Sequence, residues 1–328
     1  MPENKWVVIT TINAPNSRVL EFTKLGYKIL IVGDKKTPQD WTTFDKRVTY
    51  FDYESQEREF PELSSLIGPN TYARKNLGYL YAIKNGADTI WETDDDTFPL
   101  KNLIDPLSAL SMVRHMTTEN EVWNPYSYFL PDNKIWPRGF PLEKVNSSFQ
   151  SEKLPLVSNF SSVDILQTLV NNEPDVDAVY RLTVNSDPVT FPFKSGAVEI
   201  NQGIAPGNTQ STFWLTRSSF ESIYFPITVS NRFADILKMY LAQVNNNLLY
   251  SGFLVEQFRN PHNYMIDFND EVEMYRNLVT LCEFVLNQEF GATLETLYAK
   301  LVHLRICKPS EVQVVKLFSK EISAALNS

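Results

Sequence analysis

A short apolar run that ends in three consecutive aspartates is the feature that most constrains this chain. The run Thr89–Trp91 predicts a buried strand, and Asp94, Asp95 and Asp96 follow it closely. Because successive side chains of a strand point to opposite faces, we expect Asp94 and Asp96 on one side and Asp95 on the other. Two carboxylates on one side of a strand end predict a site for Mg²⁺ or Mn²⁺. The alternative is a solvated acidic turn.

The residues before this run alternate between strand and helix patterns. Residues 6–11 are a continuous apolar run of the kind that a buried parallel strand shows. Residues 16–25 predict a helix, residues 27–34 a second strand, and residues 48–51 a third. Strand, helix and strand in this order predict a βαβ unit, and therefore an α/β fold with helices flanking a sheet.

Polar residues stand at the carboxyl ends of the first two predicted strands. Thr10 and Thr11 end the first, and Asp34 ends the second. Open α/β sheets bind their ligands beyond the carboxyl ends of the strands, so we expect these three residues to contact a nucleotide. The Asp34 carboxylate is suited to a ribose or a base, and a tight turn is its alternative interpretation.

A predicted helix at residues 70–84 begins with a basic pair. Arg74 and Lys75 fall in its first turn, where positive charge opposes the helix dipole by about 0.3–1 kcal/mol. A diphosphate bound at this helix start would remove the conflict, because the dipole and both side chains attract an anion. A basic pair on the surface is the alternative.

Three later residues are further candidates. Asp235 falls in the first turn of a helix predicted at residues 232–242, and an ordinary acidic first turn is its alternative role. Arg138 lies in the proline-rich stretch 135–141, where it faces either a phosphate or acceptor group or a structural carboxylate. His262 follows a predicted strand and is either a metal ligand or a polar loop residue.

The remaining patterns extend the sheet and then change to helices. We predict a helix at residues 163–171, a strand at residues 175–183 and a strand at residues 211–216. From residue 271 onward apolar residues recur at spacings of three and four, which predicts a helical C-terminal extension.

Composition restricts the classes of partner. The chain has 328 residues with 43% hydrophobic content and a net charge of -9, which suits a globular protein and argues against nucleic acid or an anionic membrane as main partner. Its two cysteines form no zinc motif and no disulfide framework. No signal peptide pattern and no apolar run near 18 residues is visible, so a soluble, cytoplasmic protein is expected.

Several of these stretches together resemble the STELLO family of glycosyltransferases. The resemblance runs in order from about residue 6 to residue 267 and does not cover the C-terminal helices. We therefore expect a domain at residues 1–268 and a helical extension at residues 269–328. The stretches that carry the resemblance are Gly33–Pro38, Tyr72–Ala82, Glu92–Asp96, Trp136–Leu142, Pro174–Leu182 and Arg259–Asn263.

The resemblance implies a GT-A fold, which is an α/β sheet that binds a nucleotide sugar. It identifies residues 94–96 with the metal-binding Asp-x-Asp motif of such folds. It also implies that Asp235 is a general base and that His262 is a further metal ligand. The run Arg232–Ile236 is in addition similar to exostosin-like transferases and UDP-arabinopyranose mutases.

The expected function is metal-dependent transfer of a sugar from a nucleoside diphosphate sugar, such as a UDP-sugar, to an acceptor hydroxyl. In this reading Arg74 and Lys75 contact the diphosphate or the base, Mn²⁺ or Mg²⁺ neutralises the leaving group, and Asp235 deprotonates the acceptor with inversion. Asp95 then contacts the sugar or the backbone. The alternatives are a nucleotide-sugar mutase and a non-catalytic scaffold on the same fold.

Overall fold

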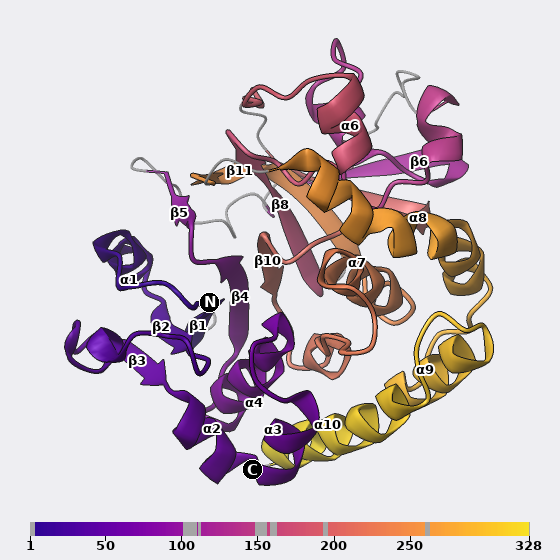
Figure 1. Cartoon of the computed structure of the whole chain (residues 1–328). Coiled ribbons are helices and arrows are strands. Elements are labelled where there is room, and N and C mark those ends of the chain that lie inside the picture. The colour runs from indigo at the N-terminus through magenta and orange to yellow at the C-terminus, as the bar shows by residue number, and fades with distance from the viewer. Residues whose placement is uncertain are drawn as a thin grey trace.

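A mixed β-sheet runs through the whole molecule (Figure 1). The computed structural model describes residues 4–100, 110, 113–147, 156–157, 163–192, 196–259 and 263–327. Within them the strands lie in the order β3-β2-β1-β4-β10-β8-β11-β9-β6-β7, and β5 pairs with β11. The strands are β1 (Lys5–Thr10), β2 (Lys28–Val32), β3 (Val48–Phe51), β4 (Thr89–Asp94), β5 (Thr97–Pro99), β6 (Val113–Val122), β7 (Leu156–Val157), β8 (Ile165–Asn171), β9 (Ala197–Ile204), β10 (Ser211–Trp214) and β11 (Leu248–Gln257).

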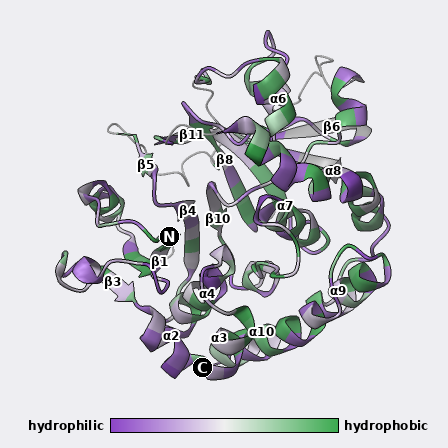
Figure 2. Cartoon of the chain, in the orientation of Figure 1, coloured by the Kyte–Doolittle hydropathy of each residue, from purple (hydrophilic) through white to green (hydrophobic). Residues whose placement is uncertain are grey.

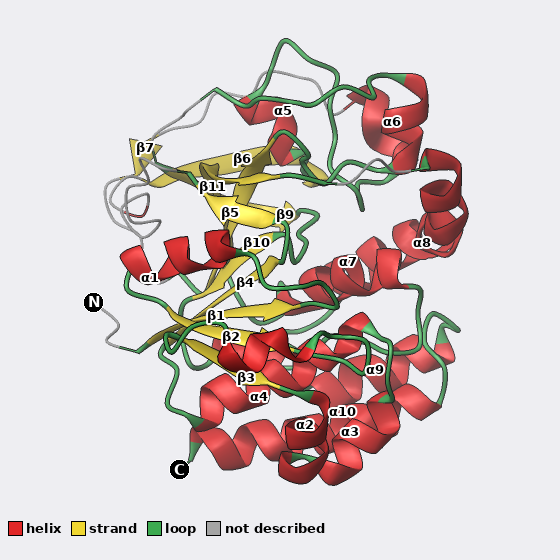
Figure 3. Cartoon of the chain, turned by 60° about the vertical axis from the view of Figure 1, so that its left-hand side comes forward, coloured by secondary structure: helices red, strands yellow, loops and turns green. Residues whose placement is uncertain are grey.

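Helices cover both faces of this sheet (Figure 3). The predicted α/β class is therefore confirmed, with a large sheet of mixed direction. The α-helices are α1 (Glu21–Lys24), α2 (Tyr53–Glu59), α3 (Pro61–Ile67), α4 (Lys75–Lys84), α5 (Pro125–Phe129), α6 (Ala178–Thr183), α7 (Asn231–Ala242), α8 (Tyr264–Leu286), α9 (Leu294–His303) and α10 (Ser310–Leu326). Short 3₁₀ helices lie at η1 (Ser17–Leu20), η2 (Gln39–Thr43), η3 (Tyr72–Arg74), η5 (Leu142–Ser147) and η6 (Ser219–Ser222).

The four strands β3, β2, β1 and β4 are parallel to one another, and β10 then pairs antiparallel with β4. In this register Thr10 lies opposite Val32 on one side and Asp94 on the other. The polar residues that end β1, β2 and β4 consequently meet at one edge of the sheet. Such an edge is where open α/β sheets place their ligands.

Alternate residues of the parallel strands enter two apolar cores, one on each face of the sheet. Val8 of β1 belongs to the larger core, whereas its neighbour Val7 belongs to the smaller one with Trp91 of β4. Each fully buried aliphatic or aromatic side chain contributes about 1.5–3 kcal/mol. Figure 2 shows the contrast in hydropathy between the core and the surface: strand β8 is mainly green, or hydrophobic, and the surface helix α2 is mainly purple, or hydrophilic. Burial on both faces explains why these strands are apolar without alternation.

The C-terminal helices share the larger core with the sheet. Helix α10 packs against α3 and α4, and α8 packs against α6 and α7. Figure 1 shows α10 lying beside α3. At the start of α10 the buried Glu311 accepts hydrogen bonds from Ile227 N (3.0 Å) and Thr228 N (2.8 Å). The predicted helices are thus confirmed, and the boundary predicted after residue 268 falls inside α8.

Two secondary-structure predictions are wrong. Residues 165–171 form strand β8 rather than a helix, and residues 178–183 form helix α6 rather than a strand. In β8 all residues but the last are buried, so the sequence lacks the alternation that marks a half-exposed strand. Helix α6 begins because the Asp177 side chain accepts a hydrogen bond from Tyr180 N and caps it. Among the described helices, none is long and apolar enough to cross a membrane.

Candidate active site

The three aspartates lie at the edge where the parallel strands end, and we call Asp94, Asp95 and Asp96 the acidic edge. Asp94 is the last residue of β4, and Asp95 and Asp96 form a turn before β5 begins at Thr97. Strand β5 then pairs antiparallel with β11. The side-chain alternation that an extended strand would impose therefore applies only as far as Asp94.

Asp94 is held by a tyrosine and a lysine from the start of α4. Its Oδ1 accepts a hydrogen bond from the Tyr72 hydroxyl and lies 3.8 Å from Lys75 Nζ. Lys75 is fully buried and also donates to Thr93 O at 3.1 Å. Burial raises the pKa of the Asp94 carboxyl to about 6, against the opposing charge of Lys75 and with a further contribution from Asp96.

Asp95 has a different set of partners. Its Oδ2 accepts hydrogen bonds from Thr11 Oγ1 and, at 2.8 Å, from Asn13 Nδ2. No described residue donates a hydrogen bond to its Oδ1. One carboxylate oxygen of Asp95 is therefore available to a ligand.

Asp96 connects the acidic edge to β11. Its Oδ1 accepts a hydrogen bond from Gln257 Nε2 (2.8 Å), and its backbone oxygen accepts one from Phe258 N (3.0 Å). Burial raises the pKa of Asp96, and the neighbouring charge of Asp95 adds to this effect although the Gln257 donor opposes it. Crowded negative charge of this kind is relieved by a bound cation.

A cavity of about 340 Å³ lies on one side of Asp95, and we call it the first cavity. It brings together Thr10, Thr11 and Asp34, as the sequence predicted for the ends of β1 and β2. Thr10 Oγ1 is buried and has no hydrogen-bond partner among the described residues. The remaining lining residues are Ile12, Asn13, Lys36, Asn70, Thr71, Tyr72, Asp95 and Asn231.

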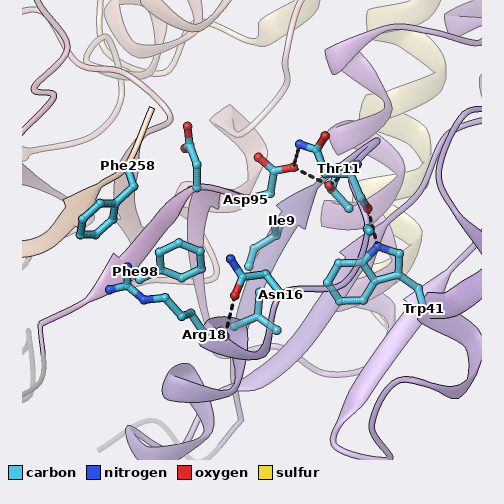
Figure 4. A pocket seen from close by; sticks show the side chains of 12 residues that line it. Ile9, Thr11, Asn16, Arg18, Trp41, Asp95, Phe98 and Phe258 are labelled. Atoms are coloured by element: carbon cyan, nitrogen blue, oxygen red, sulfur yellow. Dashed lines mark hydrogen bonds between the residues drawn. The ribbon is translucent and has the colours of Figure 1, made fainter. Parts of the chain in front are cut away.

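A second cavity of about 230 Å³ shares Thr11, Asn13 and Asp95 with the first, and Figure 4 shows the residues that line it. Asp95 and Asp96 line this second cavity, whereas Asp94 lines neither. Strand alternation predicted that Asp94 and Asp96 would face the same site. Of these two residues, Asp96 lines the second cavity and Asp94 lines neither cavity. The other lining residues are Ile9, Thr11, Asn13, Ala14, Asn16, Arg18, Val19, Trp41, Phe98 and Phe258.

The carboxylate of Asp34 is tied into the loops that surround the first cavity. One oxygen accepts a hydrogen bond from Lys35 N (2.6 Å) and the other from Thr71 N (3.1 Å). Thr71 in turn caps the 3₁₀ helix that precedes α4. Asp34 therefore fixes the loop after β2 to the start of α4, in addition to lining the cavity.

The basic pair at the start of α4 divides between two places. Lys75 points to the acidic edge, but Arg74 lines neither cavity. The fully buried Arg74 guanidinium donates to Gln56 Oε1 (2.6 Å), Ser64 Oγ (2.9 Å) and Gly68 O (2.9 Å). Burial lowers its pKa. Both side chains are fully buried, so the alternative interpretation of a basic pair on the surface is wrong.

Asp235 belongs to a buried group that we call the ion network, namely Arg138, Asp175 and Asp235. Arg138 donates two hydrogen bonds to Asp235, at 2.9 and 2.6 Å, and two to Asp175, both at 2.8 Å. Burial acts to raise the pKa of Asp175, but the charge of Arg138 outweighs it and the pKa is lowered. Asn231, one helical turn before Asp235, lines the first cavity. Asp235 thus lies one turn further along α7, beyond the first turn in which it was predicted, and it lines neither cavity.

His262 lies outside the described residues, so its predicted role as a metal ligand stays a prediction. In the part of the chain that the structure describes, no group of three or more histidine, cysteine, aspartate or glutamate side chains is arranged to hold a metal ion. The acidic edge therefore supplies its carboxylates in different directions rather than as one preformed cluster.

A second buried ion pair was not singled out from the sequence. Glu92 of β4 and Lys238 of α7 are both fully buried, with 2.6 Å between Glu92 Oε2 and Lys238 Nζ. Burial lowers the pKa of Lys238 to about 8, against the raising effect of Glu92. The pair joins the strand of the acidic edge to the helix of Asp235. The sequence shows this pair only as a glutamate within the strand segment TIWETD and a lysine within the helix segment NRFADILKMYLA.

The chain is similar to plant glycosyltransferases. No family model matches it. The probable glycosyltransferases STELLO2 and STELLO1 of Arabidopsis thaliana are each 26% identical to it over 306 residues, which is 86% of this chain. The aligned part is 39% of each relative, so the chain spans about two fifths of their length. The resemblance that the motifs indicated is confirmed as a distant similarity.

Proposed function

We propose that this chain is a glycosyltransferase that takes its sugar from a nucleoside diphosphate sugar, most simply a UDP-sugar, on a GT-A type of fold. The observation that carries the proposal is the first cavity, which lies at the carboxyl ends of β1 and β2 beside the acidic edge. This is the position at which open α/β sheets bind nucleotides. The distant similarity to probable glycosyltransferases supports it.

The first cavity supplies groups for each part of a nucleotide. Asp34 and the unpartnered hydroxyl of Thr10 suit a ribose or a base, because both can accept hydrogen bonds from it. The exposed Lys36 lines the same cavity and suits a phosphate. Arg74, which was expected at the diphosphate, is buried, donates three hydrogen bonds within the protein and lines neither cavity, so we assign it no ligand.

Mn²⁺ or Mg²⁺ fits the donor set of the acidic edge. Asp95 and Asp96 line a cavity, and no lysine or arginine among the described residues forms an ion pair with either. Asp94 already has Lys75 nearby, so we propose Asp95 and Asp96 as the main ligands, with His262 as the predicted addition. A bound ion would neutralise negative charge on the departing nucleoside diphosphate.

Asp235 is the proposed general base. It lies on α7 one turn after Asn231, which lines the first cavity. Both of its oxygens accept hydrogen bonds from Arg138, and Oδ1 accepts another from Ile236 N, so a lone pair of Oδ2 is what remains to take a proton. The same pairing specifically favours the alternative of a non-catalytic protein that binds nucleotide sugars. Release of UDP from UDP-sugars, followed with a panel of saccharide acceptors, separates the two.

A thermal-shift experiment tests the nucleotide site. UDP, ADP and GDP are each added with and without Mn²⁺, and we expect one of them to raise the melting temperature only with the metal. A ligand at about 100 times its dissociation constant stabilises the native state by about 2.7 kcal/mol. If no nucleoside diphosphate changes the melting temperature with either Mn²⁺ or Mg²⁺, the proposed function fails.

A further inference from the structure

We propose that the second cavity binds a neutral saccharide ring. This inference rests on the proposed function, because it assigns the sugar to the cavity that adjoins the nucleotide. Thr11, Asn13 and Asp95 line both cavities and so form the wall between them. A ligand in the second cavity would therefore lie next to the nucleotide.

Aromatic rings stand at both ends of the second cavity. Figure 4 shows Trp41 at one end and Phe98 and Phe258 at the other, with Ile9 and Asp95 between them. The face of an aromatic ring carries negative partial charge, and the C–H bonds of a sugar ring carry weak positive charge. Sugar rings consequently pack on aromatic faces while their hydroxyls remain free for polar partners.

An arginine fixes the two phenylalanine rings. The Arg18 guanidinium lies 4.3 Å from the centre of the Phe98 ring and 4.6 Å from that of Phe258. Its Nη2 is 2.9 Å from Glu256 Oε1, which holds it in place. Phe258 is 50% exposed. A ligand that packs on this ring would remove apolar surface from water.

Charge favours a neutral ligand over an anionic one. Arg18 is the cation that lines the second cavity, and Glu256 already pairs with it. Asp95 and Asp96 then leave the lining negative, and a divalent ion held by both would only bring it to neutral, so a phosphate or a sugar acid finds no unpaired positive charge there. The neutral hydroxyls of a sugar carry no such electrostatic penalty.

Size limits the ligand to about one ring. Pockets for drug-sized ligands have volumes of roughly 300–1,000 Å³, and the second cavity, with about 230 Å³, is smaller than these. The ring is either the sugar of the donor or the first ring of the acceptor. Both have the same chemistry, so the experiment has one arm for each.

The test uses Phe258→Ala, with Phe290→Ala as the matched control. Both phenylalanines are exposed, but Phe290 lies outside both cavities and is 85% exposed. In the donor arm, calorimetry with Mg²⁺ present compares UDP with UDP-glucose, UDP-galactose and UDP-N-acetylglucosamine. In the acceptor arm, saturation-transfer NMR measures methyl glucoside, methyl galactoside and methyl mannoside in the presence of UDP and Mg²⁺.

We expect Phe258→Ala to weaken binding about 3- to 10-fold in one of the two arms, as loss of an aromatic contact does. Binding of UDP itself should not change, which also shows that the variant is folded. Phe290→Ala should change neither. If native protein binds UDP but Phe258→Ala weakens no UDP-sugar and no glycoside, the saccharide inference is overturned and the proposed function stands. If native protein binds no nucleotide, the proposed function fails instead.

Discussion

The acidic edge and the ion network use the same carboxylate chemistry in opposite ways. In the ion network every carboxylate oxygen of Asp175 and Asp235 accepts a hydrogen bond from Arg138. At the acidic edge Asp95 has an oxygen without a partner among the described residues, and burial raises the pKa of Asp94 and Asp96. One group is electrostatically satisfied within the protein and the other is not.

This difference indicates which group is built to hold the fold and which to bind a ligand. A buried arginine with two carboxylates joins segments that are distant in sequence, here two loops at residues 138 and 175 and helix α7 at residue 235. Carboxylates that repel one another beside a cavity store an electrostatic cost that a cation or substrate removes. Asp235 decides between these two roles. It is paired with an arginine as a member of the ion network, but it was predicted to act together with the acidic edge.

The largest effect is expected for Asp235→Asn. If Asp235 is the base, UDP release that depends on an acceptor falls by roughly 10²–10⁴-fold, because the amide cannot take the proton. Binding of UDP, measured by calorimetry, should stay within about twofold of the native value, which is about 0.4 kcal/mol. Turnover close to that of the native protein would assign Asp235 to the ion network alone.

Removing the cation of the ion network should destabilise the protein strongly. Arg138→Met leaves two buried carboxylates without a partner, so we expect the free energy of unfolding to fall by about 3–5 kcal/mol in urea titrations. Arg47→Met is the control, because its ion pair with Asp45 lies on the surface and its loss should not move the midpoint. A similar small change for both variants would show that the ion network is not structural.

Single amides at the acidic edge test how the metal is held. We expect Asp95→Asn and Asp96→Asn each to weaken Mn²⁺ binding in the presence of UDP by about 10- to 100-fold, whereas Asp94→Asn weakens it less. The reason is that Asp95 and Asp96 line the cavity and Asp94 is held by Tyr72 and Lys75. Electron paramagnetic resonance of free Mn²⁺ measures this. Metal loss in Asp94→Asn alone would reverse the assignment.

The smallest effect is a dependence of stability on pH. Because burial raises the pKa of Asp94 from 3.8 to about 6, the folded protein binds this proton more tightly than the unfolded chain. The free energy of unfolding, measured without metal, should therefore fall as pH rises from about 4 to 6. Since the side chain is 24% exposed, we expect a fall of about 1–2 kcal/mol.

Asp94→Asn should remove this part of the pH dependence, because the amide does not titrate. Asp175 supplies the opposite sign, since its pKa is lowered and its contribution is lost only as pH falls below about 4. If the free energy of unfolding of Asp94→Asn falls between pH 4 and 6 as steeply as that of the native protein, the raised pKa of Asp94 is not the cause of the pH dependence.

The sequence determined the parallel half of the sheet, the edge at which its strands end in polar residues, and the C-terminal helices. Apolar runs in 6–11, 27–34 and 89–91 end in polar residues, and such strands leave their carboxyl ends at one edge. Local patterns suffice there because strand, helix and polar ending all lie within a few residues of one another. Polar residues at the ends of the first two strands also predicted that Thr10, Thr11 and Asp34 would lie close together, and all three line the first cavity.

Only the tertiary structure decided which charged residues face a cavity and which are held inside. Arg74 and Lys75 are adjacent in sequence, but one is bound by Gln56 and Ser64 and the other approaches Asp94. Asp235 is paired with an arginine 97 residues away, and no local pattern contains that contact. Charge is long-ranged and is satisfied by whatever the fold brings near, so its role is fixed by packing rather than by spacing along the chain.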